Sequence, residues 1–161
     1  MSAPDPSIAL DVCSDKNQLW QAAIFLERCR FFDAPGRVDY HLFTSDTVPD
    51  HLHAAFGDTH IRENVSTNLA SDKFQSLDYV TPATLLRITA IGELAERYDL
   101  VVYCDVDMYL QRGAFADLLP FLDTGKPIGA VRDAVNWQVG RNHKRSDSNF
   151  FTHEQNSQYF N

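Results

Sequence analysis

The sequence predicts an α/β domain of three layers, in which helices cover both faces of a mostly parallel β-sheet. Short apolar runs alternate along the chain with longer segments of helical periodicity, and this alternation is typical of consecutive βαβ units. The run at 99–104 (DLVVYC) is nearly all apolar, as expected for a strand that is buried on both faces of a parallel sheet. We therefore expect right-handed connections between the strands.

The first half of the chain contains three predicted strands separated by helices. Residues 7–13 (SIALDVC) are an apolar run suited to a buried strand, although Asp11 interrupts it. Apolar residues recur at helical spacing over 17–32, and the sequence DAPG directly after them ends this helix. The residues expected to face the core from this helix are Leu19, Ala22, Ala23, Leu26 and Cys29. The following elements are a strand at 38–44, a short helix at 49–56 and a weaker strand at 59–65.

The second half begins with the segment 68–76, which has no clear period and is predicted to be a loop. Thr81 and Pro82 provide an N-cap and a first turn for a helix over 83–97. Its expected core side consists of Leu85, Leu86, Ile88, Ile91, Leu94 and Ala95, and its expected solvent side of Thr89, Glu93, Glu96 and Arg97. The remaining predicted elements are a strand at 99–104, a helix at 114–122 and a fifth strand at 128–132.

Length and composition indicate a single domain over residues 1–161. With 161 residues and 44% hydrophobic content, the chain can bury one ordinary core. Its 14 basic and 22 acidic residues give a net charge of −8, which disfavours nucleic acid as a partner because such binding requires a basic surface. An anionic ligand would therefore need a local source of positive charge.

Cysteine spacing and the N-terminal sequence predict a cytoplasmic protein without a transmembrane segment. Cys13, Cys29 and Cys104 are an odd set without C-x-x-C spacing, and they are expected to be reduced thiols, two of them within apolar runs. The N-terminus MSAPDP lacks the basic and apolar regions of a signal peptide, and no stretch reaches 18 uninterrupted apolar residues.

Two aspartates, Asp105 and Asp107, directly follow the most apolar predicted strand. In open α/β sheets, ligands bind outside the carboxyl ends of the strands, and residues two apart on an extended backbone point the same way. Two close carboxylates repel unless a proton or a cation lies between them. Mg²⁺ or Mn²⁺ fits such oxygen ligands and keeps positions open for phosphates. The alternative is that one or both aspartates are ordinary turn residues.

Arg87 strengthens the prediction of an anion site near these aspartates. On a helix over 83–97 it shares a side with Ile91 and Leu94, and a guanidinium turned toward the core needs a carboxylate or phosphate partner. A structural ion pair with a neighbouring aspartate is the alternative. The sequence SDKN follows the first strand where a G-x-G-x-x-G loop would stand, so a glycine-rich phosphate loop is absent there.

Several segments, taken in order, resemble glycosyltransferase family 8, which includes glycogenin and bacterial lipopolysaccharide galactosyl- and glucosyltransferases. The segments are SDKN, TPATLLRITAIGEL, YDLVVYCDVDMYL, GKPIGAVRDA and the terminal QYFN. The resemblance implies a GT-A fold, a nucleotide-sugar donor such as UDP-glucose or UDP-galactose, Mn²⁺ or Mg²⁺ as cofactor, and transfer of a hexose with retention at the anomeric carbon.

The resemblance also implies roles for individual residues. Asp105 and Asp107 would bind the metal, with Asp105 also near the ribose, and Asp15 and Asn17 would contact the uridine end. Arg87 would support the donor, and Asp133 and Asn161 would hold sugar hydroxyls. Asn17 as a helix cap and Asp133 as a strand-end residue are the alternatives.

The chain also departs from the family pattern. It stops at Asn161, whereas the family continues through acceptor-site residues and a late H-x-x-G-x-K-P-W segment whose histidine is a third metal ligand. We therefore expect a donor-binding domain that is incomplete at its C-terminus, with the catalytic nucleophile unassigned. The acceptor is unknown and could be a glycan, a lipid-linked sugar, a protein or a small polyol. Self-association through exposed apolar surface is a further expectation.

Three other interpretations stay open from the sequence. The chain could be a nucleotide-sugar-binding fragment without catalysis. It could also be a haloacid-dehalogenase-type phosphatase with Asp105 as nucleophile, although Tyr109 stands where that group typically has Thr or Val. A purely structural α/β domain is the third alternative.

Overall fold

The computed structural model describes residues 6–32, 38–66, 82–109 and 111–130. The chain divides into two compact units, Met1–Leu122 and Asp123–Asn161, and the first contains all the described strands. The elements are β1 (Ile8–Ser14), α1 (Leu19–Phe32), β2 (Val38–Thr44), α2 (Asp50–Phe56), β3 (His60–Arg62), α4 (Pro82–Ala95), β4 (Leu100–Tyr103), α5 (Ala114–Leu118) and the 3₁₀ helix η1 (Leu119–Thr124).

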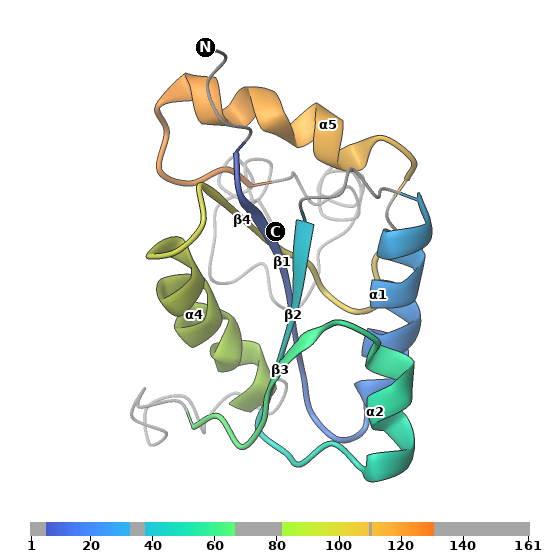
Figure 1. The fold of residues 1–161 in the computed structure, drawn as a ribbon. Coiled ribbons are helices and arrows are strands. Elements are labelled where there is room, and N and C mark those ends of the chain that lie inside the picture. Colours follow the sequence, from blue (N-terminus) through green and yellow to red (C-terminus); the bar gives the residue numbers. More distant parts are fainter. Residues whose placement is uncertain (1–5, 33–37, 67–81, 110, 131–161) are drawn as a thin grey trace, which may run out of the picture. The chain divides into compact units, whose positions relative to one another are not determined.

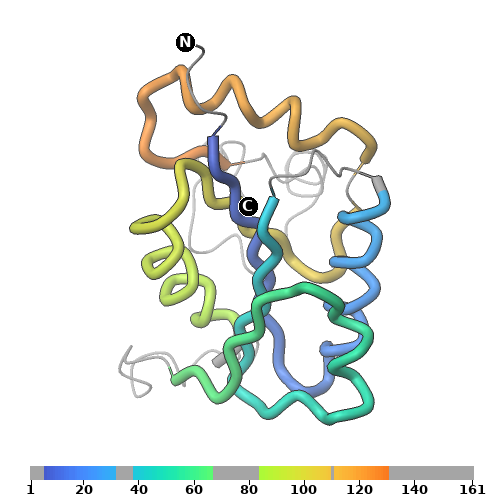
Figure 2. Tube along the Cα trace, viewed as in Figure 1, coloured from blue at the N-terminus to red at the C-terminus, as the bar shows by residue number. Residues whose placement is uncertain are grey.

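The described strands form one parallel sheet in the order β3-β2-β1-β4. The helices α1 and α2 lie on one face of the sheet and α4 lies on the other (Figure 1). Figure 2 shows β1 and β4, which are far apart in the sequence, running side by side in the middle of the fold. The predicted three-layer α/β class is therefore confirmed.

The central strand β1 explains why two hydrophobic clusters form. All seven of its residues are buried, and alternate residues point to opposite faces of the sheet. Leu10 and Val12 pack in the cluster with α1 and α2, whereas Ala9 and Cys13 pack in the cluster with α4. Asp11 also points to the α4 face, and there it stands in register with His41 on β2 and Tyr103 on β4.

The core side of α1 agrees with the prediction, because Leu19, Ala22, Ala23, Leu26 and Cys29 are all buried. All three cysteines are buried free thiols. Trp20 and Ile24 on the same helix are 57% and 54% exposed, and self-association stays a prediction. Among the described residues, no helix is both long and apolar enough to cross a membrane.

The core side predicted for the helix over 83–97 is partly wrong. Leu86, Ala90 and Leu94 are buried, whereas Ile88 is 57% and Ile91 40% exposed, and Ala95 is exposed as well. A helix buries one stripe of residues at spacings of three and four. The six apolar residues of this helix cover a wider arc than one stripe, so their pattern alone did not identify the buried side.

Two predicted elements near the end of the described chain differ from the structure. The helix expected at 114–122 is α-helical only to Leu118 and continues as η1, because Pro120 has no N–H to donate within an α-helix. The strand expected at 128–132 is absent at 128–130, since an apolar run becomes a strand only where another strand pairs with it. The segments 68–76 and 131–132, and Thr81, lie outside the described residues.

Candidate functional site

A pocket of about 370 Å³ lies at the carboxyl ends of β1 and β4, beside the start of α4. We call it the β1–β4 pocket. Three separate segments form it, because the parallel pairing of β1 with β4 brings the chain after each strand to the same edge of the sheet. The lining residues are Cys13, Asp15, Asn17, Gln18, Thr84, Arg87, Tyr103, Asp105, Val106 and Asp107.

Five of the predicted site residues meet in this pocket. Asp15 and Asn17 follow β1, Arg87 extends from α4, and Asp105 and Asp107 follow β4. Asp133 and Asn161 lie outside the described residues. The structure therefore brings together all of the predicted site residues that it describes, and their binding roles stay a prediction.

The two aspartates after β4 meet in the pocket by a different route from the one predicted. We expected an extended backbone, but the chain turns at Val106 and Asp107, and the N–H of Met108 donates to the carbonyl of Asp105 over 3.1 Å. Turns form readily at Asp, which tolerates their backbone conformations. Both carboxylates nevertheless line the β1–β4 pocket.

One oxygen of Asp105 receives two contacts. The Tyr103 hydroxyl donates to Oδ1 over 2.5 Å, and Arg87 Nη2 lies 3.4 Å from the same atom. The Arg87 guanidinium is also 4.6 Å from the centre of the Tyr103 ring, and its Nε donates to the Thr84 carbonyl over 2.9 Å. The ion pair that the sequence left open for Arg87 is therefore present.

Among the described residues, the lining of the pocket carries excess negative charge. In that set Asp15, Asp105 and Asp107 face one guanidinium, that of Arg87. Asp107 is exposed and makes no hydrogen bond or ion pair with any described residue. Asp15 accepts from the backbone N–H of Asn17 over 2.8 Å, which fixes the loop after β1 in an Asx-turn. The pocket thus has the charge of a cation site.

A hard divalent cation fits these residues. Among the described residues no group of three or more His, Cys, Asp or Glu side chains forms a metal site. The pocket instead offers carboxylate oxygens on Asp105 and Asp107. Mg²⁺ and Mn²⁺ accept such oxygens and commonly keep several positions for water and phosphate.

Buried titratable groups line the pocket or lie next to residues that line it. Asp11 is fully buried, its Oδ1 has no partner among the described residues, and burial raises its pKa to about 7. Cys13 donates from Sγ to Asp11 Oδ2 over 3.7 Å. Burial and then the charge of Asp11 raise the pKa of Cys13, so this thiol stays protonated. Burial, Asp105 and Asp11 likewise raise the pKa of Cys104 to about 12.

The sequence reasoning missed Tyr103 and gave no role to Asp11. An aromatic residue in an apolar strand is usually a core residue, so Tyr103 gave no separate signal. Its position two residues before Asp105 was the available signal, because residues two apart on a strand share a face. Asp11 was visible as the polar interruption of the first strand.

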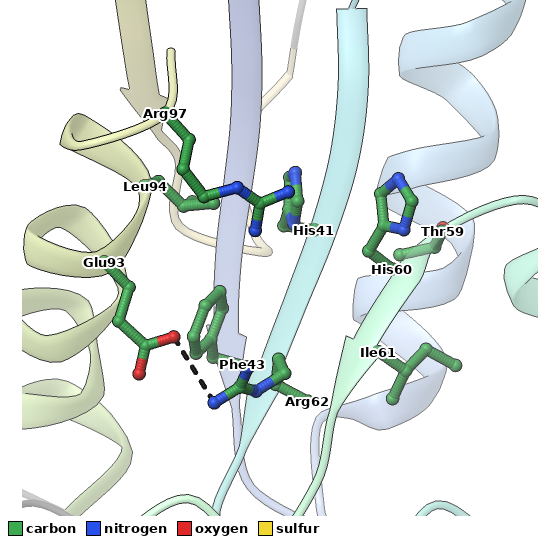
Figure 3. A pocket seen from close by; sticks show the side chains of 9 residues that line it. All are labelled: His41, Phe43, Thr59, His60, Ile61, Arg62, Glu93, Leu94 and Arg97. Carbon is green, nitrogen blue, oxygen red and sulfur yellow. Dashed lines mark ion pairs between the residues drawn. The ribbon is translucent and has the colours of Figure 1, made fainter.

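A second pocket, of about 400 Å³, lies between β2, β3 and the end of α4. We call it the β2–β3 pocket; Figure 3 shows its side chains. Arg62 and Glu93 form an ion pair of 3.4 Å across it. His41 Nε2 lies 3.1 Å from the Tyr98 hydroxyl, which donates to Asp39 over 2.8 Å. Burial, and then neighbouring His60, lower the pKa of His41 to about 4, so this imidazole is neutral at pH 7.

Comparison with known protein families assigns the chain. Residues 42–161 match the family model described as glycosyl transferase family 8. The chain belongs to glycosyl transferase family 8. The family named from the sequence motifs is therefore confirmed, in place of the haloacid-dehalogenase alternative. A comparison with curated proteins found no match.

Solved structures show the same fold. The Q189E active-site mutant of LgtC has a TM-score of 0.57 and 15% identity, with 81% of this chain and 48% of that chain covered. The galactosyltransferase LgtC, in complex with donor and acceptor sugar analogues, has a TM-score of 0.54 and 14% identity, with 86% and 53% covered. These similarities confirm the GT-A-like fold, and the family 8 chain spans about half the length of these LgtC chains.

Proposed function

We propose that this family 8 chain is the donor-binding part of a metal-dependent retaining glycosyltransferase, which moves a hexose from a nucleotide sugar to an acceptor. One observation carries the proposal: Asp15, Asn17, Arg87, Asp105 and Asp107 converge in one pocket at the carboxyl edge of a parallel sheet. The proposed donor is UDP-glucose or UDP-galactose. The acceptor, whether a glycan, a lipid-linked sugar, a protein or a small polyol, is left open.

Asp105 and Asp107 would hold the Mn²⁺ or Mg²⁺ ion of this proposal. Asp105 offers Oδ2, because its Oδ1 is already contacted by Tyr103 and Arg87, and Asp107 is free of described partners. When bound, the cation would stabilise the negative charge that develops on the nucleoside diphosphate leaving group. The cation would also supply local positive charge for an anionic donor, which a chain of net charge −8 otherwise repels.

The remaining residues would bind and orient the donor. The Asx-turn at Asp15 presents the loop after β1 to the uridine end. Arg87 adds positive charge for the donor beside Asp105. Asp133 and Asn161 are proposed to hold sugar hydroxyls, on the strength of the family resemblance. The three buried free thiols support the proposal of a cytoplasmic protein.

Binding and turnover of candidate donors test this function. We expect isothermal titration calorimetry to detect UDP binding when Mn²⁺ or Mg²⁺ is present and to detect much weaker binding when EDTA removes it. Transfer or hydrolysis of UDP-glucose and UDP-galactose is then measured under the same conditions. Absence of UDP binding with either metal would contradict the proposal.

A non-catalytic binding module is the second candidate. The observation that favours it is that every role proposed for the described residues of the β1–β4 pocket is a binding role, and none is that of a catalytic nucleophile. Metal-dependent UDP binding without turnover of either sugar nucleotide would support the module. A melting temperature that neither metal nor UDP alters would support a purely structural domain, because a ligand that binds only the folded state stabilises it.

A further inference from the structure

We propose that Tyr103 is a positioning residue for Asp105. Through its hydroxyl and its ring, Tyr103 keeps both protein contacts on Oδ1 and so leaves Oδ2 for the divalent cation of a nucleoside diphosphate. This inference rests on the proposed function, because it concerns the same pocket. It adds a residue to the site and specifies which oxygen of Asp105 that site uses.

The hydroxyl of Tyr103 supplies the first contact. Tyr103 ends β4, and Asp105 lies two residues later, so that the phenol can reach back to the carboxylate over 2.5 Å. Hydrogen bonds from O–H groups to ionised carboxylates are short and about twice as strong as neutral ones. The Tyr103 phenol therefore donates to Asp105 and supplies one of the two contacts on Oδ1.

The ring of Tyr103 supplies the second contact indirectly, by fixing Arg87. The guanidinium lies 4.6 Å from the ring centre, a geometry in which the positive charge is attracted to the face of the ring. Arg87 Nη2 then points to Oδ1 of Asp105 over 3.4 Å. One side chain thus governs both groups that contact this oxygen.

Arg87 at the same time contacts only one of the two oxygens of Asp105. Arginine and carboxylate groups frequently pair through two parallel hydrogen bonds, and that arrangement would consume Oδ2 as well. Here Nε donates to the Thr84 carbonyl over 2.9 Å, and Nη2 contacts Oδ1 of Asp105. Oδ2 makes no hydrogen bond or ion pair with any described residue.

Two substitutions separate the hydroxyl from the ring. Tyr103→Phe keeps the ring beside Arg87 and removes the donor, whereas Tyr103→Leu removes both. We expect Tyr103→Phe to weaken Mn²⁺-dependent UDP binding about 10-fold, as expected for the loss of a hydrogen bond to a charged group. Tyr103→Leu should weaken it further, because the ring that holds the Arg87 guanidinium beside Oδ1 is lost as well.

Tyr109→Phe is the matched control. Tyr109 follows Asp107 in the same loop and is 77% exposed, and an arginine, Arg28, likewise lies 4.7 Å from its ring centre. The same chemical change therefore occurs beside the pocket without touching Asp105. Its affinity for UDP in Mn²⁺ should equal that of the original chain.

The measurements are UDP affinity in Mn²⁺ by calorimetry, Mn²⁺ affinity by electron paramagnetic resonance, and the melting temperature without metal. The NMR signal of the Arg87 Nε–H reports on the guanidinium without metal; it should persist in Tyr103→Phe and broaden in Tyr103→Leu. A Tyr103→Phe variant that binds Mn²⁺ and UDP as tightly as the original chain would overturn the inference, whatever its melting temperature, and leave the proposed function standing. Failure of the original chain to bind UDP would contradict both the inference and the proposed function.

Discussion

The two pockets on the α4 face of the sheet have similar volumes, about 370 and 400 Å³, but they differ in charge balance. In the β2–β3 pocket, Arg62 pairs with Glu93, and the Tyr98 hydroxyl links neutral His41 to Asp39. Arg97 also lines this pocket, and Asp39 lies next to it, beside His41. Among the described residues, two arginines are thus balanced by two carboxylates, Glu93 and Asp39.

The β1–β4 pocket differs because, among the described residues that line it, carboxylates outnumber cations. In that part of the chain Asp15, Asp105 and Asp107 face Arg87, and like charges held close together destabilise a fold unless a cation or proton joins them. A pocket that a protein leaves uncompensated is a stronger candidate for ligand binding than one whose charges cancel. The difference in charge therefore favours the β1–β4 pocket, since the two volumes are similar.

The largest expected effect concerns Asp11 on β1, whose protonation should make the stability of the fold depend on pH. Asp11 stands in register between Tyr103 and His41, and burial raises its pKa from 3.8 to about 7. At about 1.4 kcal/mol per pK unit, this rise corresponds to a stability change on the order of 4 kcal/mol. The folded state binds the proton more tightly than the unfolded state, so this contribution is complete below pH 3.8 and is lost as the pH rises through about 7.

Urea denaturation of the original chain and of Asp11→Asn, from pH 4 to pH 8, tests this prediction. Relative to Asp11→Asn, the original chain should lose on the order of 4 kcal/mol across that range. His41 acts in the opposite direction, because its lowered pKa removes stability as the pH falls from 6.5 toward 4, but it is present in both chains and cancels. A difference in unfolding free energy that does not change with pH would show that Asp11 does not hold a proton near neutrality.

The next largest expected effect is on UDP affinity, when one carboxylate is removed from the β1–β4 pocket. Asp107→Ala should lower Mn²⁺-dependent UDP affinity by about 100-fold or more, since one of two proposed carboxylate ligands is lost. The metal-free melting temperature should stay equal or rise slightly, because one of three repelling charges is gone. Calorimetry and thermal melting check the two parts, with Asp117→Ala on the exposed side of α5 as control. Normal UDP binding by Asp107→Ala would count against the metal site.

The local pattern of the sequence predicted most elements of the fold and the location of the candidate site. It did not identify every residue that forms the site. The α1 stripe was predicted correctly because its inward residues, from Leu19 to Cys29, follow a single helical stripe. The position of Asp105 and Asp107 was predicted because the carboxyl end of a buried parallel strand is a general ligand-binding location. Both inferences depend only on residues close together in the chain.

The parts that were missed depend on contacts between distant segments. Packing against the sheet decided that Ala90 rather than Ile88 is buried on α4. The turn at Val106 and Asp107 replaced the expected extended backbone. In the sequence, Tyr103 has the pattern of a core residue. Its role depends on Arg87 of α4, whose guanidinium lies over its ring. The pKa of Asp11 is raised because the neighbouring strands and α4 exclude water from its side chain, which its sequence position alone does not show.

The smallest expected effect is on stability and comes from the ion pair in the β2–β3 pocket. Glu93→Gln removes the partner of Arg62 and leaves that pocket with excess positive charge. The two side chains are 58% and 42% exposed, so water screens the pair and its loss should change the unfolding free energy by less than about 1 kcal/mol. Urea denaturation measures this change.

UDP affinity in Mn²⁺ should be the same in Glu93→Gln as in the original chain, because Glu93 does not line the β1–β4 pocket. Glu96→Gln, an exposed residue just beyond α4, controls for the loss of a surface carboxylate. If Glu93→Gln weakened UDP binding as strongly as Asp107→Ala, charge imbalance would not distinguish the two pockets. The compensated pocket would then have to be counted as part of the donor site.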